Sequence, residues 1–240
     1  MSEPTPLASG PMSAVGETTI VPVSQPKIDP GDKKVLCSAM CKCDKAPQAG
    51  KDGQQLKQVC VSANFKALDK LLEHRSPFKQ EINYDMTKNP PAPIMDSGVG
   101  TKGHAYLPGW IRKYWEPEQA VRYTPGAGLI RRPDVVIVKD PLKPPTQDNI
   151  KQIIEIKFPP DELSKNQREA YIKIAGGRGK LVKLVPGDCD CESNQPKDPH
   201  MPVEELGFAA AAAAWLAYIR TKGKTPRPPL SPFPPLVPAL

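Results

Sequence analysis

Two segments decide the fold: RRPDVVIVKD at residues 131–140 and IIEIKFPPDELSKNQREAYIKIAGGRGKLVKLV at residues 153–185. Their apolar, β-branched runs predict strands at 133–138, 150–158 and 180–185, the first two antiparallel across a proline-containing loop. Ser164 and Gln167 then form the S-x-x-Q capping-box pattern of a helix that ends at Gly176 and Gly177. This order of elements predicts an α/β (α+β) core.

Upstream of this core, apolar residues at helical spacing predict a helix from Ser62, as its N-cap, to about residue 74. Residues 87–130 are irregular and carry an aromatic cluster, which is either a core wedge or a base-stacking platform: Tyr106, Trp110, Tyr114 and Trp115. Downstream, the alanine-rich residues 208–220 predict a further helix, either packed or partner-docking.

Composition indicates one globular domain with flexible ends. The chain has 240 residues, 31 prolines and a net charge of +7. We expect a Pro/Ser/Thr-rich arm at 1–30, a cysteine-rich segment at 31–60, the folded domain at 61–221 and a Pro-rich extended tail at 222–240. A Sec-type signal peptide is not visible, and the longest apolar run, 208–219, is shorter than the roughly 20 residues that span a bilayer. A membrane protein is therefore not expected.

Six cysteines form two groups in the sequence. They are Cys37, Cys41, Cys43 and Cys60, followed by the C-x-C pair Cys189 and Cys191. Four neighbouring thiols suit a structural Zn²⁺, but the C-x₃-C-x-C spacing departs from the usual zinc pattern. An even number of cysteines also permits three disulfides. Zinc, disulfides, and a mixture with free thiols remain open.

Three charged residues carry the chemistry. Glu155 and Lys157, two apart on a strand, point to the same face, and an antiparallel partner brings Asp134 opposite them. Two converging carboxylates suit Mg²⁺ or Mn²⁺, and a neighbouring lysine can activate a water or stabilise developing phosphorane charge. These groups are the components of metal-assisted phosphodiester hydrolysis. Alternatively, Glu155 and Lys157 are polar outward residues of a half-buried strand.

Residues 130–186 resemble the VRR-NUC branch of the PD-(D/E)XK nucleases. That family shows P-D, an apolar strand, E-x-K, a D-x-L-S loop, then Q and an aromatic residue one turn later. The matching residues are Pro133, Asp134, Glu155, Lys157, Asp161, Leu163, Ser164, Gln167 and Tyr171. The resemblance implies a restriction-endonuclease-like core, a mixed central sheet flanked by helices.

The resemblance also implies the roles of these residues. Asp134, Glu155 and the carbonyl of Ile156 would hold the metal, and Lys157 would be the catalytic lysine. Gln167 would lie near the site, although its capping-box role explains it without catalysis. The family adds a glutamate from its first helix; Glu73 and Glu81 are the candidates, and the polar Gln80–Glu81 pair favours Glu81.

Basic residues around this site suit a nucleic-acid substrate. Between Lys151 and Lys183 there are eight Lys/Arg and four acidic residues. Contacts from the basic residues to phosphate would be salt-dependent. The candidate DNA-contacting residues are Arg131, Arg132, Lys165, Arg168 and Tyr171. A base-reading motif is not visible, which favours backbone- or structure-directed cutting.

The resemblance, together with chain length and composition, suggests a biological setting. We expect a DNase toxin made in the bacterial cytoplasm and delivered by a type VI secretion system into the cytoplasm of target cells. Its partners would be DNA, a cognate immunity protein with acidic residues, and spike or chaperone proteins of the secretion apparatus. The alternatives are a phage or repair-type structure-specific nuclease, an RNase toxin, and a non-enzymatic DNA-binding module.

Overall fold

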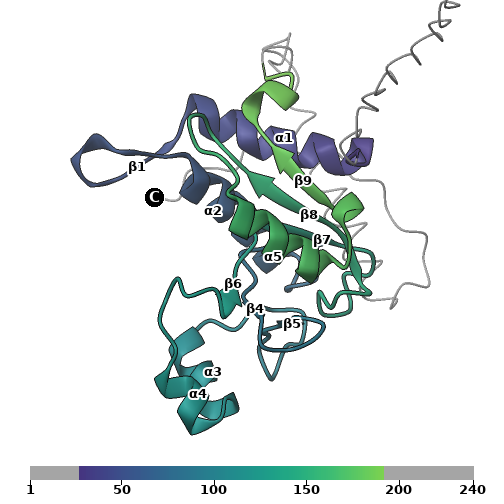
Figure 1. Ribbon diagram of the computed structural model, residues 1–240. Helices are drawn as coiled ribbons and strands as arrows, with labels where there is room; N and C mark the ends of the chain where they lie inside the picture. The colour runs from purple at the N-terminus through teal and green to yellow at the C-terminus, as the bar shows by residue number, and fades with distance from the viewer. Residues whose placement is uncertain (1–26, 192–240) are drawn as a thin grey trace, which may run out of the picture.

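A four-stranded mixed sheet forms the centre of the computed structural model, which describes residues 27–191 (Figure 1). Its strands, in spatial order, are β3 (Phe78–Gln80), β7 (Val135–Val138), β8 (Ile150–Ile156) and β9 (Leu181–Leu184). The β3–β7 and β7–β8 pairs are antiparallel, and the β8–β9 pair is parallel. The predicted strands and the antiparallel pairing of the first two are confirmed.

Helix α5 (Lys165–Ala175) connects the parallel strands β8 and β9. Its N-terminus is a capping box: Ser164 Oγ accepts from the Gln167 N–H at 3.2 Å, and Gln167 Oε1 accepts from the Ser164 N–H at 3.3 Å. Its C-cap is Gly176, whose φ of 76° lies in the left-handed region that favours glycine. Both predicted ends of this helix are confirmed.

The sheet is buried on both faces, as strict alternation along β7 shows. Val135 and Ile137 pack with helices α1 (Pro30–Lys45) and α2 (Lys57–Leu71), whereas Val136 and Val138 pack with α5. Helices α1 and α5 therefore cover opposite faces (Figure 1). This is the predicted α+β architecture of a mixed sheet flanked by helices.

Helix α2 begins earlier than the sequence pattern predicts. It starts at Lys57, so Ser62 is an interior residue and the prediction that it is the N-cap is wrong. The hydroxyl of Ser62 donates instead to Gln80 Oε1 at 3.2 Å. Before the helix, a hairpin with a 3₁₀ turn projects from the molecule (Figure 1): β1 (Gln48–Ala49), η1 (Lys51–Gly53) and β2 (Gln55–Leu56).

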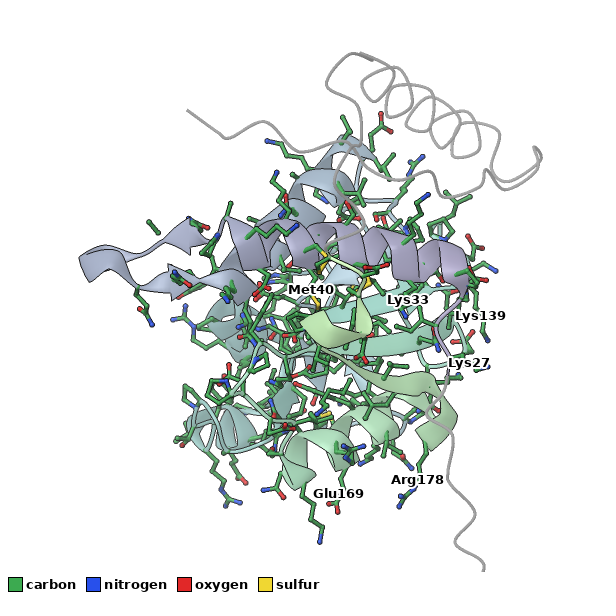
Figure 2. The ribbon with its side chains drawn as sticks, turned by 90° about the horizontal axis from the view of Figure 1, so that it is seen from above. Lys27, Lys33, Met40, Lys139, Glu169 and Arg178 are labelled. Atoms are coloured by element: carbon green, nitrogen blue, oxygen red, sulfur yellow. A yellow bond between two sulfur atoms is a disulfide. The ribbon has the colours of Figure 1, made fainter. Side chains whose placement is uncertain are left out.

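All six cysteines are paired in disulfides, which resolves the alternatives that the sequence leaves open. The bonds join Cys37 to Cys189, Cys41 to Cys191, and Cys43 to Cys60. The structural zinc alternative is therefore not supported: every thiol that it needs is bonded to another sulfur. The sulfur atoms lie around Met40 of α1 (Figure 2), whose Sδ is 3.9 Å from Cys189 Sγ.

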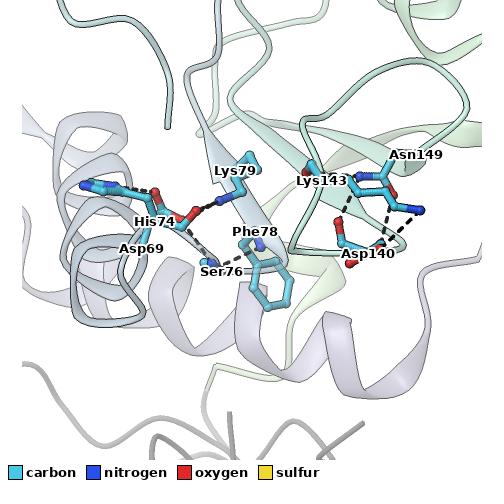
Figure 3. Close-up of polar contacts among 8 residues, drawn as sticks. All are labelled: Asp69, His74, Ser76, Phe78, Lys79, Asp140, Lys143 and Asn149. Atoms are coloured by element: carbon cyan, nitrogen blue, oxygen red, sulfur yellow. Dashed lines mark hydrogen bonds and ion pairs between the residues drawn. The ribbon is translucent and has the colours of Figure 1, made fainter. Parts of the chain in front are cut away.

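Polar clusters fix the ends of the central strands (Figure 3). The Lys79 ammonium of β3 is 1% exposed and donates to Asp69 Oδ1 at 2.8 Å, while Asp69 Oδ2 lies 3.1 Å from His74 Nδ1. In the loop between β7 and β8, the Asn149 amide donates to the Asp140 carbonyl at 2.9 Å. These contacts hold α2 against β3 and close the β7–β8 connection.

A small lobe interrupts the fold between β3 and β7. Its elements are β4 (Tyr84–Asp85), β5 (Ala92–Pro93), α3 (Leu107–Tyr114), α4 (Pro117–Val121) and β6 (Ile130–Arg131). Trp115 is buried and its indole N–H donates to Asp85 Oδ2 at 2.9 Å, so this member of the aromatic cluster is a core wedge. Tyr106 and Tyr114 are exposed and are not.

Short 3₁₀ turns, η2 (Arg178–Lys180) and η3 (Pro186–Asp188), flank β9. Within residues 27–191, no helix has both the length and the apolar character needed to cross a bilayer. The predictions for most of the N-terminal arm, for the helix at 208–220 and for the tail at 222–240 lie outside the described residues.

Candidate active site

Asp134 and Glu155 come together at one end of the β7–β8 pair. Val135 is opposite Ile154 in the antiparallel register, so one further step places Asp134 opposite Glu155. The backbone N–H of Ile156 donates to Asp134 Oδ2 at 2.8 Å and fixes this carboxylate against the neighbouring strand. The juxtaposition predicted from strand periodicity is present in the structure.

Lys157 completes the cluster on the same face. Its ammonium lies 2.9 Å from Glu155 Oε1, and the two residues are 8% and 1% exposed. The backbone N–H of Lys157 donates to the Leu184 carbonyl at 3.0 Å, which ties the residue to β9. The alternative in which Glu155 and Lys157 are outward, solvated residues is thereby wrong, because α5 covers this face of the sheet.

Burial disfavours the charged forms of both carboxylates, and repulsion from Glu155 adds to this effect at Asp134. Desolvation first, and the Glu155 charge second, raise the pKa of Asp134 to about 7, against the opposing effects of the Ile156 N–H and the Lys157 charge. Burial also raises the pKa of Glu155, while its contact with Lys157 lowers it. Both carboxylates are therefore harder to ionise in the folded chain than in water.

A divalent cation fits this arrangement. Glu155 Oε2 is buried without a hydrogen-bond partner in the described structure, which leaves an anionic oxygen available as a ligand. Among residues 27–191, no group of three His, Cys, Asp or Glu side chains is placed to hold a metal. Two carboxylates, a backbone carbonyl and water are, however, a suitable ligand set for Mg²⁺, which keeps several waters in protein sites.

The cluster opens into a pocket of about 350 Å³. One wall is the first half of α2, which contributes Gln58, Val59, Val61 and Ser62. Gln58 Nε2 donates to the Ile156 carbonyl, the expected metal ligand, at 3.2 Å. Sequence reasoning missed this wall because it began the helix at Ser62; the four-residue spacing of Gln58 and Ser62 was the available signal.

Of the two candidate glutamates, Glu81 lines the pocket and Glu73 does not. Glu81 follows β3 with a φ of 48°, and its backbone N–H donates to the Asp134 carbonyl at 3.0 Å. Its carboxylate lies 3.2 Å from Lys66 Nζ and 3.8 Å from the Arg132 guanidinium. Glu81 therefore stands beside the carboxylates of the candidate site, where its charge contributes to raising the pKa of Asp134.

Gln167 and Tyr171, one turn apart on α5, also line the pocket. Gln167 caps the N-terminus of α5 and also lines the pocket. Tyr171 is 3% exposed and its hydroxyl donates to the Arg132 carbonyl at 3.2 Å. Burial raises the pKa of this hydroxyl above its usual range. The ring is part of the core, so a DNA contact by Tyr171 is confined to its hydroxyl edge.

The remaining candidate DNA-contacting residues differ in whether they line the pocket. Arg132 lines it, with a side chain that is 57% exposed and 3.8 Å from Glu81. Arg131 is half-buried on β6, one residue before it. Lys165 and Arg168 are exposed on α5 and are not among the lining residues; Lys165 lies 4.0 Å from Glu169.

The mixed sheet and its buried Asp–Glu–Lys cluster define the class of PD-(D/E)XK nuclease-type domains. The family model of the VRR-NUC domain matches residues 79–184, from β3 to the end of β9. This part of the chain is a VRR-NUC domain, and it supports a nuclease, hence a hydrolase, in general terms. Comparison with curated proteins and with solved structures finds no match.

The raised pKa of Asp134 predicts that stability falls as the pH rises. Its folded-state pKa of about 7 exceeds the ordinary value of 3.8, so between these values the folded chain binds more protons than the unfolded chain. In EDTA, the unfolding free energy of the wild type should fall when the pH rises from 4 to 8. We expect this fall to exceed the one in Asp134→Asn by on the order of 2 kcal/mol.

Chemical denaturation across this pH range measures the effect. At pH 8, added Mg²⁺ should stabilise the wild type, because it binds the ionised site of the folded chain alone. Asp134→Asn should respond little, although its side-chain oxygen can still accept from Ile156. Parallel pH profiles for the two chains, or equal responses to Mg²⁺, would contradict this account of the site.

Proposed function

We propose that this protein is a metal-dependent DNA endonuclease. The observation that carries the proposal is the buried convergence of Asp134, Glu155 and Lys157, with one carboxylate oxygen unpartnered, at the base of a pocket that Arg132 borders. The VRR-NUC match over the same residues agrees with this chemistry. The excess of basic residues along the second half of the domain supports a polyanionic substrate.

The ion would be held by Asp134, Glu155 and the carbonyl of Ile156. When bound, it supplies Lewis-acid polarisation of the scissile phosphate and lowers the pKa of a water nucleophile. Gln58 already donates to the Ile156 carbonyl, but a carbonyl oxygen has two lone pairs and one stays available.

The other residues position the substrate and stabilise charge. Lys157, held by Glu155 at 2.9 Å, has further N–H donors that can orient the attacking water or a phosphoryl oxygen. The guanidinium of Arg132 is placed to hold the phosphate on the solvent side of the pocket. Burial beneath α5 lowers the local dielectric, so each of these interactions is stronger than in water.

Incubation of supercoiled plasmid with the full chain in Mg²⁺, Mn²⁺ or EDTA tests the proposal. We expect nicking or degradation that needs metal and is lost in Glu155→Ala and Lys157→Ala. Glu81→Gln should reduce cleavage, and Glu73→Gln, also at a positive φ but outside the pocket, is its matched control. If the plasmid stays intact with every metal and RNA is cleaved instead, RNA would replace DNA as the proposed substrate.

We further propose that the chain acts as an antibacterial toxin, delivered by a type VI secretion system into the cytoplasm of target cells and neutralised by an immunity protein. The three disulfides support a chain that leaves the reducing cytoplasm, since such bonds persist in oxidising environments. The basic pocket border suits an acidic inhibitor.

Expression inside a bacterial host whose cytoplasm is oxidising enough for the three disulfides to form tests the toxin role. The wild type should stop growth and degrade the chromosome, Glu155→Ala should not, and co-expression of a cognate immunity protein should restore growth. Equal growth with wild type and Glu155→Ala, at equal protein levels and with nuclease activity confirmed in vitro, would contradict the toxin role and leave the nuclease proposal standing.

A further inference from the structure

Helix α3 exposes a stripe of aromatic side chains. Tyr106 at its N-cap, Trp110 and Tyr114 are spaced by four residues and so lie along one side of the helix. Tyr106 is 57% exposed and Tyr114 is 47% exposed, whereas Ile111 and Trp115, on the other side, are buried. The helix is thus anchored through one face and presents the rings of Tyr106 and Tyr114 to solvent on the other, while Trp110 is half-buried.

Two of the rings, those of Trp110 and Tyr114, are in contact, and the third lies against the helix backbone. The centroids of Trp110 and Tyr114 are 5.3 Å apart, and the Lys113 ammonium lies 5.0 Å from the Tyr114 centroid. The ring of Tyr106 lies against Gly109, where an added Cβ would meet its Cδ1 at 2.5 Å. Glycine at this position therefore lets the ring lie flat on the helix backbone.

The surroundings of the stripe are basic. Between residues 82 and 132 there are seven Lys/Arg against four acidic residues, of which Asp85 is buried. The basic residues are Lys88, Lys102, Arg112, Lys113, Arg122, Arg131 and Arg132, and the acidic ones are Asp85, Asp96, Glu116 and Glu118. Aromatic rings beside a surplus of cations are the features that bind single-stranded nucleic acid, through base stacking and phosphate contacts.

The lobe that carries the stripe is attached directly to the pocket. Its chain leaves after Glu81 and returns at Arg132, and both residues line the pocket. Strands β4 and β6 pair where the chain leaves and returns, and Met86 N–H donates to the Leu129 carbonyl at 2.9 Å. Figure 1 shows α3 and α4 beyond this pairing, on the side away from the central sheet.

We propose that the aromatic stripe of Tyr106, Trp110 and Tyr114 binds unpaired nucleotides of the DNA strand whose backbone enters the pocket. This inference rests on the nuclease proposal for the substrate and deepens it, because it makes single-stranded or locally opened DNA the preferred form. Stacking on the rings tolerates any base, in accord with a site that has no base-reading motif.

The affinity of a fluorescent single-stranded oligonucleotide for the full chain carrying Glu155→Gln tests the inference, because this substitution removes cleavage from the measurement. Adding Tyr106→Ala and Tyr114→Ala together should weaken binding about thirtyfold, the loss of two stacked bases. Tyr106→Phe with Tyr114→Phe should retain the affinity, because the rings remain. Val121→Ala, in the same lobe and 86% exposed, should leave it unchanged.

Gly109→Ala provides a second variant that does not remove an aromatic ring. Alanine favours the helix over glycine, yet its methyl group must displace the Tyr106 ring, so we expect several-fold weaker binding in a stably folded chain. The Ala double variant should bind a blunt duplex of the same length almost as tightly as the parent chain does, since the bases of a duplex are already stacked on one another.

Unchanged single-strand binding in the Ala double variant, or equal losses in the Ala and Phe variants, would overturn the inference and favour a protein-docking role for the stripe. Failure of the plasmid assay would reject the DNA nuclease separately, because this binding measurement uses a chain that lacks Glu155.

Discussion

Replacing Glu155 with glutamine is expected to lower the rate of metal-dependent DNA cleavage at least a thousandfold, about 4 kcal/mol of transition-state stabilisation. The glutamine side chain has the same shape and can still accept from Lys157, now 2.9 Å from Glu155 Oε1. It removes the anionic oxygen Oε2, which is buried without a partner and is the proposed metal ligand. The loss is therefore electrostatic rather than steric.

The same substitution should change the stability in EDTA little, because the loss of the buried Lys157 ion pair opposes the relief of carboxylate repulsion. It removes the Glu155 charge that helps to raise the pKa of Asp134, so the repulsion between the two carboxylates disappears. Single-turnover cleavage rates and denaturation curves, measured together, separate the two effects. Glu162→Gln is the matched control, since Glu162 is exposed and lies outside the pocket.

Two results would contradict this prediction. Retention of more than a tenth of the wild-type rate by Glu155→Gln would place the metal elsewhere. An unfolded Glu155→Gln chain would show that the charge is needed for folding rather than for catalysis.

Removing both long-range disulfides should cost on the order of 7 kcal/mol of unfolding free energy, whereas removing either one should cost about 2 to 3 kcal/mol. The Cys37–Cys189 and Cys41–Cys191 bonds span 152 and 150 residues and close nearly the same loop. Either bond alone restricts the long loop in the unfolded chain. The second bond then closes a much smaller ring, so its additional effect is small.

Denaturation of Cys37→Ala/Cys189→Ala, Cys41→Ala/Cys191→Ala and the quadruple variant measures this non-additivity. The quadruple variant should lose more than the two double variants together. Additive losses would contradict the shared-loop explanation. The effect of the quadruple change is comparable to the total stability of many domains, 5 to 15 kcal/mol, so this chain is expected to depend on oxidation for its fold.

The elements that the sequence predicted well are those with local physical signals. Strands β7 and β8 follow from apolar, β-branched runs, and α5 follows from its capping box and terminal glycine. The pairing of Asp134 with Glu155 follows from strand periodicity and a short connection. The N-terminus of α2 was missed because Ser62, a good capping residue, bonds to Gln80 instead.

The sequence by itself determined the candidate site residues and the VRR-NUC character of residues 79–184, because both depend on residue type and spacing along the chain. Tertiary structure alone decided the disulfide pairing, the wall that Gln58 builds beside Ile156, and the exposure of Tyr106 and Tyr114. The physical reason is that these features depend on contacts, or on the lack of cover, between segments far apart in the chain. Local periodicity, such as the four-residue spacing of Gln58 and Ser62, shows which residues share one side of a helix but not which distant segment that side contacts.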